Sequence, residues 1–208
     1  MGDIIASERA TSVEELHQIF NRAIREHNAT YAGQLVSPLT ITLGDEFQGL
    51  TTSLAAGAAI VRSLRLQLLS RKVECRFVIG QAEVRTPLNR DNAWNMMGPG
   101  LADARAKLGQ KRKHSAYAFS LPAHGLMQTI LDAIGAGLTV IERGWTDHQR
   151  SFVTMALGGK SSAKIALEQH VTNRSVYKVL AAADMEAWKM QWSAIDAALA
   201  ALDAESQP

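Results

Sequence analysis

The chain has 208 residues, of which 47% are hydrophobic and 20% are charged. This composition excludes a disordered chain, and the single cysteine excludes an intramolecular disulfide. No apolar run reaches the about 18 residues that a membrane helix requires, and the N-terminus lacks the pattern of a signal peptide. The formal net charge of +2 is too small to indicate nucleic-acid binding by itself. We therefore expect a cytoplasmic protein with one large domain or two smaller ones.

The first part of the chain alternates between helix and strand patterns. Apolar residues at three- and four-residue spacings predict a helix over 13–28, for which Ser12 is a suitable N-cap. Alternating apolar and polar residues predict a strand over 39–43 and a returning strand over 47–50, with Gly44-Asp45 as the turn.

The same patterns predict further elements up to about residue 137. They are a helix over 52–70, a strand over 73–80 that contains an inward-facing Cys75, its hairpin partner over 82–86, a helix from Pro99 to about Leu108, a strand over 114–119, and a helix that begins at Pro122 and fades near Gly135 and Gly137. The order strand–helix–strand–strand–helix–strand, with additions, predicts a ferredoxin-like α+β sandwich. Its helices would cover one face of an antiparallel sheet.

A different pattern begins at Trp145. Thr146 and Gln149 have the spacing of a capping box, and three short helical segments follow to about residue 182. We therefore predict two domains, 1–143 with the α+β sandwich and 144–208 with an all-α unit.

Residues 162–181 have the pattern of a helix-turn-helix. Ile165 and Ala166 would face inward on the first helix, and Val176 and Val179 on the second, with Val171 anchoring the turn. His170 stands where the turn usually prefers Gly, so it must adopt a positive φ.

The outward residues of this segment suit DNA. Arg and Asn can bind guanine and adenine edges in the major groove, while Ser, Tyr and Lys suit phosphates, and the Gly158–Ser161 stretch offers backbone amides at a helix N-terminus. The alternative is a trihelical or protein-interaction module. The predicted DNA contacts are Lys160, Ser161, Thr172, Asn173, Arg174, Ser175, Tyr177 and Lys178.

The last predicted helix has a heptad stripe, which must be buried somewhere. It either packs within the chain or forms a homodimer, and two-fold dimers of helix-turn-helix units read palindromic half-sites. The stripe consists of Met185, Trp188, Trp192, Ile195, Leu199 and Leu202.

Two short segments place an Asp directly after a Gly beside an apolar strand, at Gly2-Asp3 and at Gly44-Asp45. In the predicted sheet the first strand lies next to the third, so Asp3 would approach Asp45. Two carboxylates that lie close together repel one another, and a bound divalent cation usually compensates for this repulsion. The sequence therefore predicts a site for Mg²⁺ or Mn²⁺. The simpler interpretation is that Gly44-Asp45 only forms a hairpin turn.

Four stretches resemble the SatD family of bacterial proteins: 2–7, 44–50, 76–84 and 98–105. The resemblance extends over nearly the whole chain, including the helix-turn-helix segment. More remotely, the first domain resembles the palm of class III nucleotidyl cyclases and GGDEF-type diguanylate cyclases. This resemblance implies a metal–nucleotide site with Asp3 and Asp45 as metal ligands and nucleotide contacts from Ile4, Gly44, Glu46 and Arg105.

The sequence departs from the cyclase pattern at Ala102, near the expected Asn, and at Leu43, which replaces the first Gly of a GGDEF turn. A basic cluster over 111–114 is either a solvated loop or a phosphate contact. The leading hypothesis is a dimeric DNA-binding regulator whose first domain senses a metal–nucleotide ligand. The alternatives are a Mg²⁺- or Mn²⁺-dependent nucleotidyl cyclase or nucleotidyltransferase and a non-catalytic interaction module.

Overall fold

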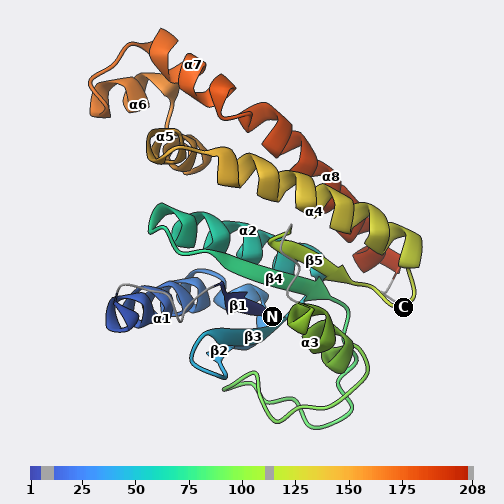
Figure 1. Cartoon of the computed structure of the whole chain (residues 1–208). Helices are drawn as coiled ribbons and strands as arrows, with labels where there is room; N and C mark the ends of the chain where they lie inside the picture. The colour runs from blue at the N-terminus through green and yellow to red at the C-terminus, as the bar shows by residue number, and fades with distance from the viewer. Residues whose placement is uncertain (6–11, 111–114, 206–208) are drawn as a thin grey trace.

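The computed structural model describes residues 1–5, 12–110 and 115–205. The predicted basic cluster 111–114 therefore lies outside the described residues. Within them, five strands form one sheet in the order β2-β3-β1-β4-β5 (Figure 1). The strands are β1 (Gly2–Ile4), β2 (Leu35–Ile41), β3 (Glu46–Thr51), β4 (Cys75–Gly80) and β5 (Tyr117–Ser120).

The first strand is central, as predicted. It pairs antiparallel with β3 on one side and with β4 on the other. β2 pairs antiparallel with β3, whereas β5 runs parallel to β4. The sheet is therefore mixed, and the prediction of a wholly antiparallel sheet was wrong at its β5 edge.

Helices cover both faces of the sheet, not one. α1 (Val13–Thr30) and α2 (Leu54–Ser70) lie on one face, where Phe20, Phe47 and Phe77 make edge-on ring contacts at centroid distances of 5.9 and 6.2 Å. α3 (Leu101–Gly109) lies on the opposite face, where Ala104 and Leu108 pack against Val78. Ser12 caps α1 as predicted, and a short 3₁₀ turn, η2 (Ala32–Gln34), leads into β2.

The segment after β4 does not form the predicted hairpin partner over 82–86. Both edges of β4 are already occupied, by β1 and by β5, so no edge remains for a further strand. Residues 81–100 instead form a long loop, in which Glu83 N–H donates to Pro99 O at 2.9 Å and Arg85 N–H donates to Met97 O at 2.8 Å.

α4 (Gly125–Gly144) does not fade at Gly135 and Gly137 but continues to Gly144. Gly135 packs against β5, where an added Cβ would lie 2.9 Å from Tyr117 Cβ and 3.2 Å from Tyr117 O. The missing side chain therefore permits a close helix–strand contact, and this packing outweighs the poor helix propensity of Gly.

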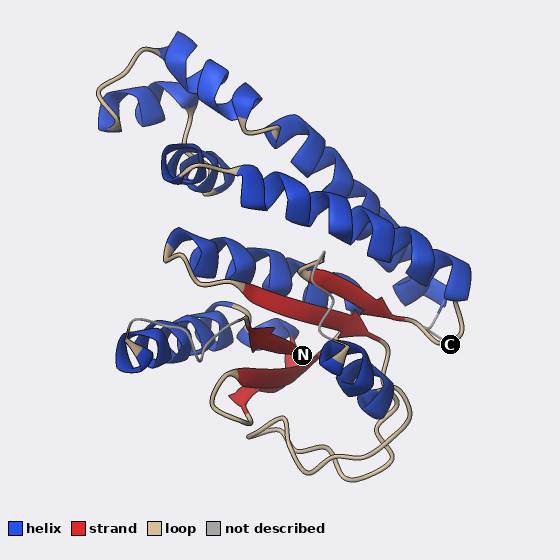
Figure 2. Cartoon of the chain, viewed as in Figure 1, coloured by secondary structure: helices blue, strands red, loops and turns tan. Residues whose placement is uncertain are grey.

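Three short helices follow: α5 (Asp147–Leu157), α6 (Ser162–Glu168) and α7 (Asn173–Ala182). The predicted capping box of Thr146 and Gln149 is present at the start of α5. These helices enclose a small apolar cluster of Phe152, Ile165, Ala166 and Val176, away from the sheet (Figure 2). No helix of the described residues is both long and apolar enough to span a membrane.

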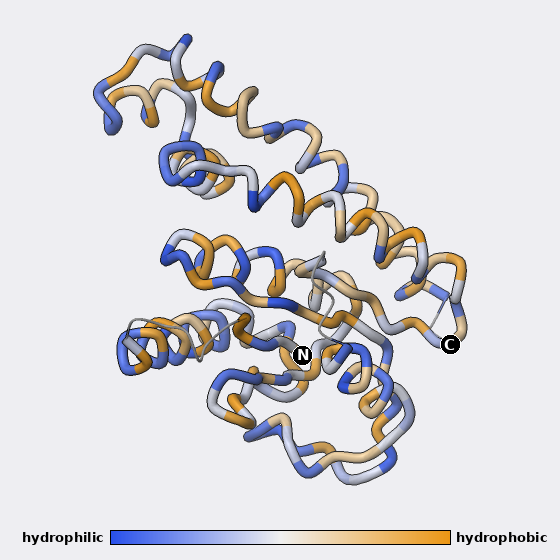
Figure 3. Tube along the Cα trace, viewed as in Figure 1, coloured by the Kyte–Doolittle hydropathy of each residue, from blue (hydrophilic) through white to orange (hydrophobic). Residues whose placement is uncertain are grey.

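α8 (Met185–Glu205) returns along α4 and α2 (Figures 1 and 3). The six residues of its heptad stripe are all buried within the chain, and all but Met185 belong to the same core as Ile4, Phe77 and Leu138. The stripe is therefore used for intramolecular packing and is not available for dimerisation. At its far end, the Asp203 carboxylate accepts hydrogen bonds from Leu54 N–H at 2.8 Å and Ala55 N–H at 2.9 Å, in the first turn of α2.

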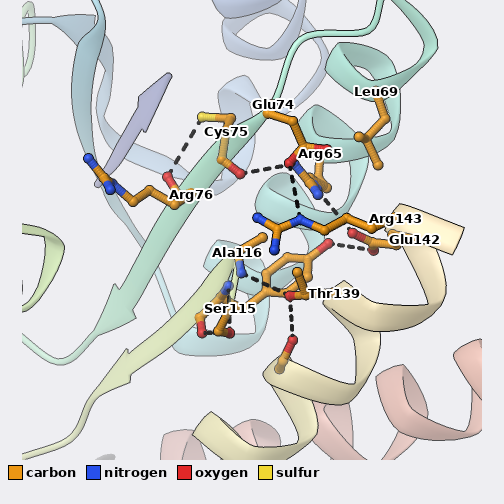
Figure 4. A network of polar contacts seen from close by, with 12 residues as sticks. Arg65, Leu69, Glu74, Cys75, Arg76, Ser115, Ala116, Thr139, Glu142 and Arg143 are labelled. Carbon is orange, nitrogen blue, oxygen red and sulfur yellow. Dashed lines mark hydrogen bonds and ion pairs between the residues drawn. The ribbon is translucent and has the colours of Figure 1, made fainter. Parts of the chain in front are cut away.

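A buried polar network joins α2, α4, β5 and α8. Figure 4 shows the part of it around Arg65 and Glu142. The Glu142 carboxylate accepts from Arg65 Nε at 3.0 Å, from Tyr117 OH at 2.6 Å and from Trp188 Nε1 at 3.0 Å. Arg65 also donates to Glu74 at 3.0 Å. Burial is the largest single influence on the pKa of Arg65 and lowers it, but Glu142, Tyr117 and Glu74 together outweigh burial, so the pKa of Arg65 lies above its ordinary value.

Candidate functional site

The chain opening and the first hairpin meet at their backbones. Ile4 N–H donates to Asp45 O at 3.0 Å, so Asp45 lies level with Ile4, just before β3. Asp3 is paired in register with Glu46 on β3 and with Arg76 on β4. Directly opposed residues share a face of the sheet, so the register makes Glu46 and Arg76 the same-face neighbours of Asp3.

The Asp3 carboxylate forms an ion pair with Arg76 Nη2, and both side chains are largely buried. Arg76 therefore supplies the positive charge that the prediction assigned to a metal ion. No group of three or more His, Cys, Asp or Glu side chains among residues 1–5, 12–110 and 115–205 is arranged to hold a metal. Mg²⁺ and Mn²⁺ prefer several oxygen ligands, and we derive no step through a metal.

A cavity of about 590 Å³ lies on the α3 side of this hairpin. Its walls come from the hairpin (Thr42, Leu43, Gln48), the long loop after β4 (Trp94, Asn95, Met96, Met97) and α3 (Leu101, Ala102, Arg105). The volume is within the range of small-molecule sites.

Arg105 is the only ionisable side chain among the described residues that line this cavity. Its guanidinium donates to Gln48 Oε1 at 3.2 Å, and the Gln48 amide in turn donates to Ala93 O. This chain of contacts ties α3, the hairpin and the long loop together around the cavity. A cationic group among apolar and amide side chains favours an anionic ligand.

The long loop is held against the hairpin by side chains of β2. Ser37 Oγ donates to Asn89 O at 2.5 Å, and Thr40 Oγ1 accepts from Ala93 N–H at 2.9 Å. Gly98 lies so close to the opposing loop segment that an added Cβ would be 1.8 Å from Glu83 O. Only Gly permits this close approach, which is a physical reason for the Gly at the start of the 98–105 pattern.

Of the predicted nucleotide contacts, only Arg105 lines the cavity. The side chain of Ile4 is buried in the main core, Gly44 adopts a φ of +70° in the turn, and Glu46 begins β3. Ala102, which stands near the position of the cyclase Asn, also lines the cavity. The sequence analysis did not identify Trp94, which is half exposed at the cavity; its position in a loop of more than a dozen residues was the available signal.

The second candidate site is formed by α6 and α7. The turn between them has His170 at a φ of +53°, as the pattern requires, and Thr172 caps α7 by accepting from Ser175 N–H. Ile165, Ala166 and Val176 are buried between the helices, and Val179 is partly buried. Val171 is more exposed than an anchor of the turn should be, although its N–H donates to Ala166 O at 3.0 Å.

The outer face of α7 is polar and open to solvent. Asn173, Arg174, Tyr177 and Lys178 are all exposed. The Tyr177 hydroxyl lies 3.1 Å from Ser162 Oγ, which connects the two helices. These four side chains therefore form one continuous surface, which we call the α7 face.

The remaining predicted DNA contacts have partners within the chain. Ser175 Oγ lies 2.9 Å from Thr172 Oγ1, so both hydroxyls belong to the cap of α7. Ser161 caps α6 by accepting from Lys164 N–H, and the Lys160 ammonium donates to Glu168 at 2.5 Å. These four residues lie beside the α7 face, where their first role is to hold the helices.

The SatD family pattern matches residues 1–160. The match includes the sheet, the cavity and α5, but it ends before α6, so it says nothing about the helix pair that we had expected it to include. A search of curated proteins gave no match, and a search of solved structures gave none either. Because the matched part is more than half of the 208 residues, the chain belongs to the SatD family.

Proposed function

We propose that this chain is a DNA-binding regulatory protein in which α6 and α7 form a helix-turn-helix and α7 enters the major groove. The observation that carries the proposal is the α7 face, where Asn173, Arg174, Tyr177 and Lys178 are exposed together while Val176 on the same helix is buried. A helix fixed to the protein on one side and polar on the other has the form of a recognition helix.

The chemistry of the α7 face supports DNA as the partner. Arg174 can donate to guanine O6 and N7, and Asn173 can pair with adenine N6 and N7. Tyr177 and Lys178 suit phosphate oxygens, and α7 contains no Asp or Glu that would repel them. Both base contacts lie in the first turn of the helix, the part that reaches base edges in this motif.

A homodimer would give two such helices for a palindromic site. Since the heptad stripe of α8 is buried within the chain, the proposed dimer must use another surface. The dimer is therefore a separate part of the proposal, which sedimentation of the free protein and of its DNA complex tests.

The test begins with selection of bound sequences from a pool of random duplexes, followed by fluorescence anisotropy on the selected and an unrelated duplex. Arg174→Ala should weaken binding to the selected duplex by about 1–3 kcal/mol and change nonspecific binding less. Lys178→Ala should weaken both duplexes similarly and reduce the salt dependence by about one phosphate contact.

Lys189→Ala is the matched control, because Lys189 is exposed on α8 and lies outside the α7 face. Its affinity for both duplexes should equal that of the unmodified chain. Failure to enrich any sequence, or equal effects of Arg174→Ala and Lys189→Ala, would contradict DNA reading by α7 and favour the interaction module.

A second candidate function is nucleotide binding in the cavity beside the hairpin, within a ferredoxin-like palm. Two observations support it: the strand order β2-β3-β1-β4, which is that of the ferredoxin-like sheet, and the cavity whose only ionisable side chain among the described residues is Arg105. The half-exposed Trp94 offers a surface on which a base could stack.

Thermal-shift measurements with nucleoside mono-, di- and triphosphates, each with and without MgCl₂ or MnCl₂, test this function. A ligand that binds the native state at 100 times its Kd should add about 2.7 kcal/mol of stability. Arg105→Gln should remove the shift. No shift with any nucleotide would contradict the site.

The same measurements separate sensing from catalysis. A shift that requires the metal and is lost in both Asp3→Asn and Asp45→Asn would support the metal–nucleotide site. Formation of a cyclic or transferred product that stops in Asp45→Asn would support the cyclase or nucleotidyltransferase alternative. Binding without product would support a sensor.

A further inference from the structure

α4 and α8 lie side by side and run in opposite directions (Figure 1). Glu142 accepts a hydrogen bond from Trp188, and five residues earlier an added Cβ at Gly137 would lie 2.9 Å from Gln191 Oε1. Falling numbers on α4 therefore match rising numbers on α8. The N-terminal half of α4 lies beside the C-terminal half of α8.

The outer side of α4 has an apolar stripe that is open to solvent. Leu126 is 78% exposed, Val140 is 70% exposed and Ile130 is 46% exposed. The exposed Ala133 lies between them, so the stripe follows spacings of three, four and seven residues along one side of the helix. A helix at the surface usually has polar residues on this side, so an apolar stripe there indicates a contact with another molecule.

α8 has a second apolar stripe, on the side opposite to its buried heptad stripe. Met190 is 72% exposed, and the exposed Ala194, Ala197 and Ala201 follow it at spacings of three and four residues. Ala194 is one helical turn from Gln191, the residue that contacts α4. The two stripes therefore border the same junction between the helices, and we call them together the α4–α8 surface.

The charged residues of these two stretches point away from the surface. On α4, the Asp132 carboxylate accepts from Phe119 N–H of β5 at 2.8 Å. On α8, Asp196 pairs with Arg62 at 2.7 Å beside a groove of about 670 Å³ between α2 and α8. The α4–α8 surface therefore offers apolar contacts and no charge, which suits an apolar protein surface and not a nucleic acid.

The two stripes are also complementary in size. Leu126 and Ile130 project from α4 at the level where α8 has only small residues, Ala197 and Ala201. At the other end, Met190 projects from α8 at the level of Gly137 of α4. One copy therefore has both the projecting and the recessed parts that a second copy needs. A two-fold axis parallel to the helices would lay α4 of each copy on α8 of the other.

The size of the α4–α8 surface is sufficient for a dimer. α4 has 20 residues, so the surface is about 30 Å long, and two helices side by side are about 20 Å wide. Each copy would thus bury about 600 Å², or about 1,200 Å² for the pair, which is the lower limit of stable interfaces.

We propose that the chain forms a two-fold dimer through the α4–α8 surface, with α4 of each copy on α8 of the other. The inference rests on the dimer of the proposed function and assigns its surface. Because the axis is parallel to α8, and α7 precedes the N-terminus of α8, both α7 helices would lie at the same end of the dimer. A palindromic site requires two recognition helices in such an arrangement.

Sedimentation velocity of the full chain without DNA tests the dimer, over about 1–200 µM protein. The sedimentation coefficient should rise from that of a monomer to that of a dimer in this range. Ala133→Lys and Ala194→Glu each place one charge per copy in the middle of the surface. Each should weaken the dimer about tenfold or more, because the charge is buried without a partner.

A mixture of the two variants should associate again, because the new lysine on α4 of one chain meets the new glutamate on α8 of the other. Ala106→Glu is the matched control, since Ala106 is exposed on α3, which covers the opposite face of the sheet from α1 and α2. It should leave the dimer unchanged. Far-UV circular dichroism of all three variants should match that of the unmodified chain, because Lys and Glu are good helix formers.

A chain that stays monomeric up to about 200 µM would overturn the proposal, and so would equal effects of Ala194→Glu and Ala106→Glu. A mixture that associates no better than its two components would overturn the placement of α4 on α8. Because no DNA is present, these results are independent of α7. A dimer that enriches no DNA sequence would contradict DNA reading alone.

Discussion

Replacing Glu142 with Gln would test whether the buried charge network holds α4, β5 and α8 together. Glu142 and Arg65 are both fully buried, and Glu142 accepts three hydrogen bonds from three different elements. The amide of Gln keeps the shape but offers only one acceptor oxygen, so its NH₂ must face an N–H or O–H donor. Arg65 would lose its closest buried carboxylate.

Breaking one side of a buried ion pair costs about 3–5 kcal/mol. Glu74 still pairs with Arg65 at 3.0 Å, and this places the expected cost near the lower limit, about 3 kcal/mol. At about 2–4 °C per kcal/mol for a chain of this size, the melting temperature should fall by about 6–12 °C. Urea unfolding and thermal melts followed by circular dichroism measure both quantities.

Glu186→Gln is the control on α8, where Glu186 pairs with Lys189 in an exposed position. Its stability should stay within about 0.5 kcal/mol of the unmodified chain. A double variant, Arg65→Met with Glu142→Leu, should cost less than the sum of the two single changes, because no unpaired charge remains. A loss below about 1 kcal/mol for Glu142→Gln, or additive costs in the double variant, would refute the reasoning.

Four further predictions concern packing, capping and titration. Gly135→Ala should destabilise by about 1–3 kcal/mol in urea unfolding because its Cβ meets Tyr117, whereas Gly144→Ala, with open space around it in the described chain, should be neutral or stabilising; equal effects would contradict the contact. Asp203→Ala should cost about 1–2 kcal/mol because α2 loses its carboxylate cap, and a value near zero would contradict that role. Burial lowers the pKa of His27 from 6.5, so the unfolded chain binds the proton more strongly than the folded chain. The free energy of unfolding should therefore fall as pH drops from about 6.5 toward 5, and it should fall less in His27→Gln. The same dependence on pH in both chains would contradict this role of His27. Burial raises the pKa of the Cys75 thiol to about 12, so a thiol reagent at pH 8 should label it only when urea unfolds the chain; rapid labelling without urea would disagree.

The sequence predicted correctly those features that depend only on residues close together in the chain. The N-cap Ser12, the capping box of Thr146 and Gln149, and the stripe that α8 buries are each set by residues within a few turns of one another. Two other features are decided by contacts with residues far away in the sequence. They are the absence of the predicted strand over 82–86 and the continuation of α4 to Gly144. β4 had no free edge, and Gly135 had Tyr117 beside it, neither of which a window of neighbouring residues contains.

The same division applies to the candidate sites. The resemblance to cyclases singled out Arg105 as a nucleotide contact, and Arg105 lines the cavity. The helix-turn-helix pattern predicted a positive φ at His170, which the structure confirms. The pairing of Asp3 with Arg76 was missed because it follows from the strand register, which brings residues 73 positions apart onto one face. The groove between α2 and α8 was missed for a related reason: its walls come from three helices, α2, α5 and α8, that are far apart in the sequence.

α8 also links two distant parts of the molecule, α7 and the N-terminus of α2. Only Ala183 and Asp184 separate it from α7, and its 21 residues extend for about 31 Å toward the N-terminus of α2, where Asp203 is bonded. α8 therefore connects the unit that contains α7 to the N-terminus of α2 through one continuous helix. A tilt of α8 by about 5° about its C-terminal end would displace α7 by about 3 Å, close to the spacing of successive base pairs in DNA.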